Sequence, residues 1–172
     1  YNIKDSDIAN LSWGSDYVAY CFGIDDDGNA TSTVATAEFS TVSPVASEND
    51  ITITIDEMTK SSVEFTVTAT NNDPYYVTLE TTDVLAPYAD KSDEELIRYL
   101  LPQYNTQIEQ RTFSGTKTIT NSDLGKNING FKSYKVVVWG FENGPTTKVF
   151  YSEEFKPTDP VIDLSVDITI DN

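Results

Sequence analysis

The chain has 172 residues, with 28 acidic and 11 basic side chains, a formal net charge of −17 and no histidine. This negative charge disfavours binding to nucleic acid and to anionic lipid, since both present phosphates to a protein. The lack of histidine excludes Ser-His-Asp and Cys-His catalysis and most zinc sites. The sequence has no apolar run of about 18 residues, so we expect no transmembrane segment.

The first predicted elements are two strands joined by an acidic turn. In LSWGSDYVAYCFGIDDDG (residues 11–28), Tyr17, Ala19 and Cys21 alternate with the residues between them and are expected to face a core. Cys21 is then a small buried side chain, and as the single cysteine it has no disulfide partner in the chain. The run DDDG at residues 25–28 lacks the alternating spacing of a calcium loop and predicts a solvated turn.

Six further segments are predicted to be strands, and the first two show the alternation of half-buried strands. We name them strands A, B, C, E, F and G, and they cover residues 50–56, 62–70, 75–82, 111–120, 133–142 and 146–155. Strand E is expected to be kinked near Gly115, and the ENG sequence ending at Gly144 predicts a tight hairpin turn between F and G. Short strands separated by turns predict a two-sheet sandwich.

Residues 92–102 interrupt the strand pattern and predict a short helix between strands C and E. Ser92 and Glu95 have the spacing of a capping box, and Pro102 ends the segment. The apolar residues fall on one side at helical spacing, and they are Leu96, Ile97, Leu100 and Leu101.

Strand F is apolar on both faces, so each face needs a cover. Tyr134, Val136 and Val138 alternate toward the predicted core, and Val137 and Trp139 point the other way. We expect the helix to pack on Val137 and Trp139. The alternative is an exposed aromatic platform that binds sugar or a partner protein.

Two parts of the chain have nearly the same sequence. Tyr17 matches Tyr134 and Gly23 matches Gly140, and both pairs are 117 residues apart. Matches at slightly smaller offsets extend from SDI at residue 6 (SDL at residue 122) to the ITID sequences at residues 53 and 168. The sequence therefore predicts tandem copies of one module.

The repeat sets the expected domain boundaries. Residues 1–45 are predicted to be the second half of one copy, and residues 47–158 a complete copy with its inserted helix at 92–102. Residues 160–172 are predicted to be a linker and the first strand of a following copy.

The matching segments resemble the tyrosine corner of fibronectin type III domains. An apolar residue, Leu11 or Ile128, precedes the strand F tyrosine, Tyr17 or Tyr134, by six positions. In that family the tyrosine hydroxyl bonds back to the backbone of the preceding turn and pins the corner between two sheets. The resemblance implies the same structural role for Tyr17 and Tyr134.

The turn departs from the family pattern in both copies. Its usual proline is replaced by Trp13 in the first copy and by Gly130 in the second, and Pro157 stands where the first copy has Thr41. Trp13 either packs against the next module or stacks on a sugar, and the sequence leaves both alternatives open.

With its acidic, threonine-rich composition, the chain is similar to divergent immunoglobulin-like sandwich repeats of bacterial cell-surface lipoproteins. The expected fold is all-β, with tandem fibronectin type III-like sandwiches and a short helix inserted between strands C and E. The resemblance implies an extracellular location at the bacterial surface, as an outer-membrane lipoprotein or a secreted protein.

No motif in the sequence indicates a catalytic reaction. Acid/base pairs, a nucleophile elbow and a phosphate loop are missing, so we expect no enzyme and no cofactor. The expected function is a structural or interaction module that spaces or presents a neighbouring domain and binds protein. Candidate contacts with a partner protein or glycan are Trp13, Trp139, Tyr75 and Tyr76.

Three alternatives stay open. The chain is a glycan-binding or accessory module of a surface hydrolase system, or it is a fimbria-like subunit in which residues 161–170 add a strand to another molecule. The third alternative is calcium held between modules by acids such as Asp159 and Asp163.

Overall fold

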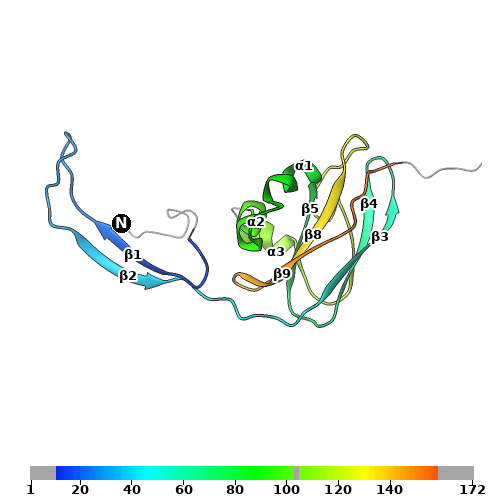
Figure 1. Ribbon diagram of the computed structural model, residues 1–172, viewed down its shortest axis with the longest axis horizontal. Helices are drawn as coiled ribbons and strands as arrows, with labels where there is room; N and C mark the ends of the chain where they lie inside the picture. The colour runs from blue at the N-terminus through cyan, green and yellow to red at the C-terminus, as the bar shows by residue number, and fades with distance from the viewer. Residues whose placement is uncertain (1–10, 103–104, 159–172) are drawn as a thin grey trace, which may run out of the picture.

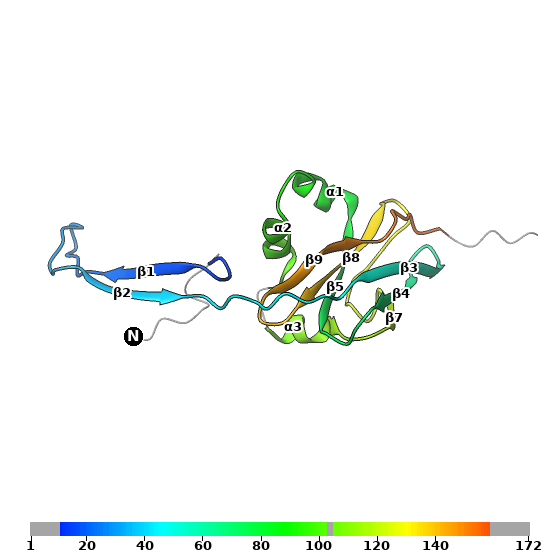
Figure 2. The same ribbon diagram turned by 60° about the horizontal axis from the view of Figure 1, so that its bottom comes forward.

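The computed structural model describes residues 11–102 and 105–158. Its first element is a hairpin of strands β1 (Asp16–Cys21) and β2 (Ala35–Ser40), which pair antiparallel with Tyr17 opposite Phe39. The hairpin extends away from the rest of the molecule in both ribbon views (Figure 1, Figure 2). The SDI sequence at residue 6 and the strand expected within residues 160–172 lie outside the described residues.

The remaining described residues form an all-β sandwich of two antiparallel sheets, as the sequence predicts. One sheet has the strand order β3-β4-β7 and the other β6-β5-β8-β9. The strands are β3 (Ile51–Met58), β4 (Val63–Ala69), β5 (Tyr75–Thr81), β6 (Thr112–Phe113), β7 (Lys117–Thr120), β8 (Tyr134–Phe141) and β9 (Pro145–Tyr151). Strands A, B, C, F and G of the sequence correspond to β3, β4, β5, β8 and β9.

The main core lies between the two sheets because alternate residues of each strand point inward. Phe65 of β4 and Val136 and Val138 of β8 are completely buried there, and Tyr134 belongs to the same cluster. The predicted inward face of strand F is therefore confirmed.

The single strand predicted over residues 111–120 is wrong, because the chain changes sheets within it. β6 pairs with β5 before Gly115, and β7 pairs with β4 after it. Gly115 has a φ of +64°, a left-handed conformation that a residue without Cβ adopts without steric cost. Its carbonyl oxygen accepts a 2.7 Å hydrogen bond from the Tyr75 hydroxyl, which ties the crossover to the core.

Helices occupy the connection between β5 and β6. They are α1 (Thr82–Leu85), the 3-10 helix η2 (Ala86–Tyr88), α2 (Asp93–Leu100) and α3 (Asn105–Gln110). The helical connection is therefore longer than the predicted residues 92–102, while α2 itself stops at Leu100. Leu101 already has extended backbone, the conformation favoured directly before a proline.

A capping box starts α2. The Ser92 hydroxyl accepts a 3.3 Å hydrogen bond from the Glu95 amide, and a Glu95 carboxylate oxygen accepts one of 3.2 Å from the Ser92 amide. The Ser92 amide lowers the pKa of Glu95 because it stabilises the ionised carboxylate. Two backbone N–H groups at the start of α2, which have no partner within the helix, thus have hydrogen-bond acceptors.

Helix α2 covers the outer face of the four-stranded sheet (Figure 1). Its Leu96 and Ile97 are buried in a second cluster with Val137, Trp139 and Tyr76. Both faces of β8 are therefore packed, one by the opposite sheet and one by the helix.

The outer face of the hairpin has no comparable cover among the described residues. Val18, Tyr20 and Phe22 are 56, 69 and 48% exposed. Cys21 is exposed as well. The prediction of a buried Cys21 is wrong for the described chain, because the described residues place no second sheet against β1.

Candidate functional site

The turn before β1 is pinned by Tyr17. Its hydroxyl oxygen accepts a 2.6 Å hydrogen bond from the Ser12 amide, and this hydrogen bond lowers the pKa of Tyr17. The ring stacks on Phe39 of the partner strand, with centroids 5.7 Å apart and planes 22° apart. The first predicted tyrosine thus lies in a corner with both a polar and an aromatic anchor.

Tyr134 makes the same arrangement in the sandwich. Its hydroxyl oxygen accepts a 3.2 Å hydrogen bond from the Asn129 amide, again five residues earlier in the chain. The ring stacks on Phe155 at 6.1 Å and 24°, and the two backbones exchange hydrogen bonds of 2.8 and 3.0 Å. Both tyrosines therefore have matching surroundings.

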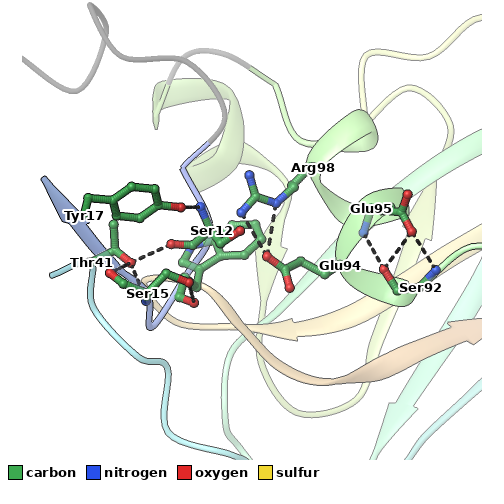
Figure 3. Close-up of polar contacts among 9 residues, drawn as sticks. Ser12, Ser15, Tyr17, Thr41, Ser92, Glu94, Glu95 and Arg98 are labelled. Carbon is green, nitrogen blue, oxygen red and sulfur yellow. Dashed lines mark hydrogen bonds and ion pairs between the residues drawn. The ribbon is translucent and has the colours of Figure 1, made fainter. Parts of the chain in front are cut away.

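The two corners differ where the sequence differs. In the first, the Thr41 hydroxyl donates to the Ser12 carbonyl at 2.5 Å and accepts from the Ser15 amide at 2.9 Å (Figure 3). In the second, a Cβ on Gly130 would lie 2.9 Å from the Pro157 carbonyl oxygen. The second turn therefore requires glycine at the position that Trp13 occupies in the first.

Trp13 packs against the sandwich. It is partly buried and joins the cluster of Trp139 and helix α2. A Cβ on Gly144, in the turn between β8 and β9, would lie 2.8 Å from Trp13 Cδ1 and 3.2 Å from Pro44 Cγ. Because Gly144 has no side chain, the Trp13 indole and Pro44 of the linker can approach the turn between β8 and β9. Of the two alternatives for Trp13, the structure shows packing, and the contact is with the sandwich.

Arg98 of α2 completes this contact. Its guanidinium carbon lies 5.0 Å from the centroid of the Trp13 ring, within the range of a cation–π interaction. Arg98 Nε and Nη2 donate to one Glu94 carboxylate oxygen at 3.2 and 2.9 Å, which holds the guanidinium in place (Figure 3). We call Trp13, Pro44, Arg98 and Gly144 the junction.

The linker between hairpin and sandwich is tied down at both ends. The Gly14 amide donates to the Val42 carbonyl at 2.9 Å, and the Ser47 amide donates to the Thr146 carbonyl at 2.8 Å. The Ser47 hydroxyl also donates to an Asp73 carboxylate oxygen at 2.6 Å. Only a few residues of the linker therefore lie between its two attachments.

Three of the four candidate contact residues lie in the core. Trp139, Tyr75 and Tyr76 are completely buried, and the rings of Tyr76 and Trp139 are 4.7 Å apart. Burial raises the pKa of Tyr75 to about 12, because the ionised phenolate would lose its hydration. No ring surface of these three reaches a ligand, so the structure removes them as candidate contacts. Trp13 remains, and its contact is with the sandwich.

The acidic turn at residues 25–28 is stabilised by its own side chains. An Asp25 carboxylate oxygen accepts hydrogen bonds from the amides of Asn29 and Asp27 at 2.8 and 3.1 Å. The Asn29 amide is the main cause of a lowered pKa for Asp25. Within residues 11–102 and 105–158, no group of three acidic or cysteine side chains is arranged to hold a metal ion.

A cavity of about 450 Å³ lies between the helical connection and the four-stranded sheet. Tyr88, Lys91 and Asp93 line it from the helices, and Lys135 and Tyr151 line it from β8 and β9. Burial and the Asp93 carboxylate raise the pKa of Tyr151, and Lys135 Nζ lies 5.9 Å from its ring centroid. Aromatic, apolar and charged side chains therefore share the lining of this cavity.

Comparisons of the chain with protein-family models, with curated proteins and with solved structures found no match. None of the helices in the described part of the chain has the length and apolar character needed to cross a membrane.

Sequence reasoning missed most of the junction. No pattern in the sequence singles out Arg98, and Gly144 is predicted only as part of a tight turn. The signal available was the asymmetry of the two corners, a tryptophan in one and a glycine in the other.

Proposed function

We propose that this chain is a non-catalytic structural and interaction segment built from fibronectin type III-like modules in series. The modules hold neighbouring domains at a fixed spacing and present them to a partner protein. The proposed location is the bacterial cell surface, on the basis of the acidic, threonine-rich composition and the resemblance to surface lipoprotein repeats.

Two features support the module type. Seven strands divided between antiparallel sheets of three and four fit an immunoglobulin-like sandwich. The hydrogen bond from a turn amide to the tyrosine hydroxyl oxygen, together with a stacked phenylalanine ring, occurs at both Tyr17 and Tyr134. On this proposal the helical connection is an insertion between strands C and E of the module.

The junction is the observation that carries the spacing function. Trp13 leaves the corner of one copy and packs on helix α2 and the β8–β9 turn of the next. A joint fixed by side-chain packing limits the angles between successive modules, whereas a flexible linker would not. An array of such joints is a semi-rigid rod.

Pulsed electron–electron double resonance, which measures the distance between two spin labels, tests this proposal. The labels are placed at Thr33→Cys in the hairpin tip and Lys156→Cys beyond β9, in a Cys21→Ser background. We expect one narrow distance distribution, which broadens when Trp13→Ala is added. Phe131→Ala is the matched control, since Phe131 is 93% exposed and does not belong to the junction. A distribution that is already broad with Trp13 present contradicts the proposal.

A glycan-binding accessory module is the second candidate. The cavity lined by Tyr151, Lys135 and Asp93 is the observation that favours it. Chemical-shift mapping with a panel of neutral and acidic oligosaccharides tests it, with Tyr151→Ala as the variant expected to lose binding.

A further inference from the structure

The outer face of the hairpin exposes large apolar side chains side by side. Tyr20 of β1 and Phe22, which directly follows β1, are 69 and 48% exposed. Residues two positions apart in extended chain point to the same side, so Val18, Tyr20 and Phe22 share one face. Contiguous exposed apolar side chains are typical of contact surfaces. A two-stranded hairpin is also only marginally stable by itself. This face therefore needs a partner.

The face of β8 that matches this face of the hairpin indicates which type of element covers it. Tyr20 and Phe22 match Val137 and Trp139 at the repeat offset of 117 residues. Val137 and Trp139 are completely buried, and the cover is helix α2. In the copy that is complete, this face thus packs against an amphipathic helix.

The sequence ahead of the hairpin indicates where such a helix comes from. Residues 1–8 (YNIKDSDI) precede the described part and match residues 117–124 (KTITNSDL) in Ile3, Ser6 and Asp7. In the complete module, residues 117–120 are β7, the last strand of the sheet that faces β8. The hairpin is thus preceded by sequence typical of the end of a module's first half.

We propose that the Tyr20–Phe22 face is a docking surface for one amphipathic helix of the α2 type, carried by the first half of a module of this kind. The helix has two pairs of adjacent apolar residues, with the second pair four positions after the first, and these side chains pack on the rings of Tyr20 and Phe22. Leu96, Ile97, Leu100 and Leu101 have this spacing in α2 and belong to or pack against its cluster. The proposal rests on the tandem arrangement of the proposed function, and it adds that the first copy also has a helical lid.

The occupant can be supplied by extending the chain. A copy of residues 46–116 placed ahead of Tyr1 provides a first half in the register of the repeat. Thiol labelling then reports each face of β1. Cys21 reports the inner face, and Tyr20→Cys in a Cys21→Ser background reports the outer face.

Both thiols are expected to react freely in the 172-residue chain, which should sediment as a monomer. In the extended chain, both labelling rates should fall at least about 100-fold, because a buried thiol reacts only when the module opens. Replacing Leu96 and Ile97 by serine in the added copy alone should restore labelling at position 20. Continued protection of Cys21 shows that this variant is folded.

The outcomes separate the two proposals. Protection of Cys21 with free labelling at position 20 overturns the helix proposal and leaves the tandem arrangement intact. Free labelling of Cys21 in the extended chain contradicts the tandem arrangement. A 172-residue chain that sediments as a dimer with position 20 already protected assigns the face to a second copy, and this also overturns the helix proposal.

Discussion

The hydroxyl oxygens of Tyr17 and Tyr134 accept the same backbone hydrogen bond, each from the amide five residues earlier in the chain. Each tyrosine also pairs with a phenylalanine of the following strand segment, Phe39 or Phe155. The repeat in the sequence is therefore a repeat of side-chain geometry.

Tyr134→Phe should lower the free energy of unfolding of the sandwich by about 1 kcal/mol, the usual net contribution of a hydrogen bond. The ring stays stacked on Phe155, so the loss reports the hydroxyl alone. Urea unfolding followed by circular dichroism measures it. Tyr151→Phe is the control and should change little, since Tyr151 is 46% exposed. Equal losses in the two variants would contradict a role for the corner.

Arg98→Ala should loosen the junction and leave the sandwich folded. The guanidinium over Trp13 is expected to contribute about 0.5–1 kcal/mol to docking. The side-chain Nε1–H signal of Trp13 in a proton–nitrogen spectrum should shift, and that of buried Trp139 should not. Lys91→Ala, which removes a cation paired with Glu95 of α2, is the control. An unchanged Trp13 signal in Arg98→Ala counts against the contact.

Gly144→Ala should displace Trp13. The new Cβ would meet Trp13 Cδ1 at 2.8 Å, and the φ of +149° is one that residues with a Cβ rarely adopt. Acrylamide quenching of tryptophan fluorescence should increase. Gly28→Ala is the matched control, because Gly28 also has a positive φ and a Cβ there has nothing within 4 Å. Quenching that rises equally in both variants contradicts the steric account.

Leu96→Ala should destabilise the sandwich by about 2–5 kcal/mol, because it leaves a cavity over Trp139. Urea unfolding measures the loss. Tyr99→Ala is the comparison on the same helix and should cost much less, since Tyr99 is 54% exposed. If Leu96→Ala costs no more than Tyr99→Ala, helix α2 does not form the cover described for β8.

Stability should fall as the pH rises above about 10, because Tyr75 ionises more readily in the unfolded chain. Burial raises the pKa of Tyr75 to about 12, whereas the unfolded value is near 10. Its contribution is thus complete below pH 10 and is lost as the pH rises toward the folded value. Unfolding midpoints between about pH 9 and 12 should drop less steeply in Tyr75→Phe than in the parent chain. Parallel curves would contradict the buried phenol.

Strand positions and both tyrosine corners were predictable because alternation and a near-constant repeat offset are local properties of the sequence. Ser92 and Glu95 likewise predicted where α2 begins. The sheet change at Gly115 was not predictable, because alternation shows which residues face inward but not which strand they pair with. The helices at Thr82–Leu85 and Asn105–Gln110 lack an apolar stripe long enough to be recognised.

Burial could be predicted only where the covering partner could be identified. The buried state of Val137 and Trp139 followed from a helix visible in the sequence. Cys21 has the same alternation as Val138, yet it is exposed, since the described residues supply no sheet to cover it. The contact of Trp13 with Arg98 and Gly144 joins residues far apart in the sequence, and no short-range pattern encodes it.

We propose that two copies of one corner occur in this chain, and backbone amide chemical shifts are the most direct test. Tyr17→Phe should shift the amide signal of Ser12, and Tyr134→Phe should shift that of Asn129 in the same direction and by a similar amount. Each change should stay within its own copy. If Ser12 does not respond to Tyr17→Phe while Asn129 responds to Tyr134→Phe, the two segments are not copies of one corner.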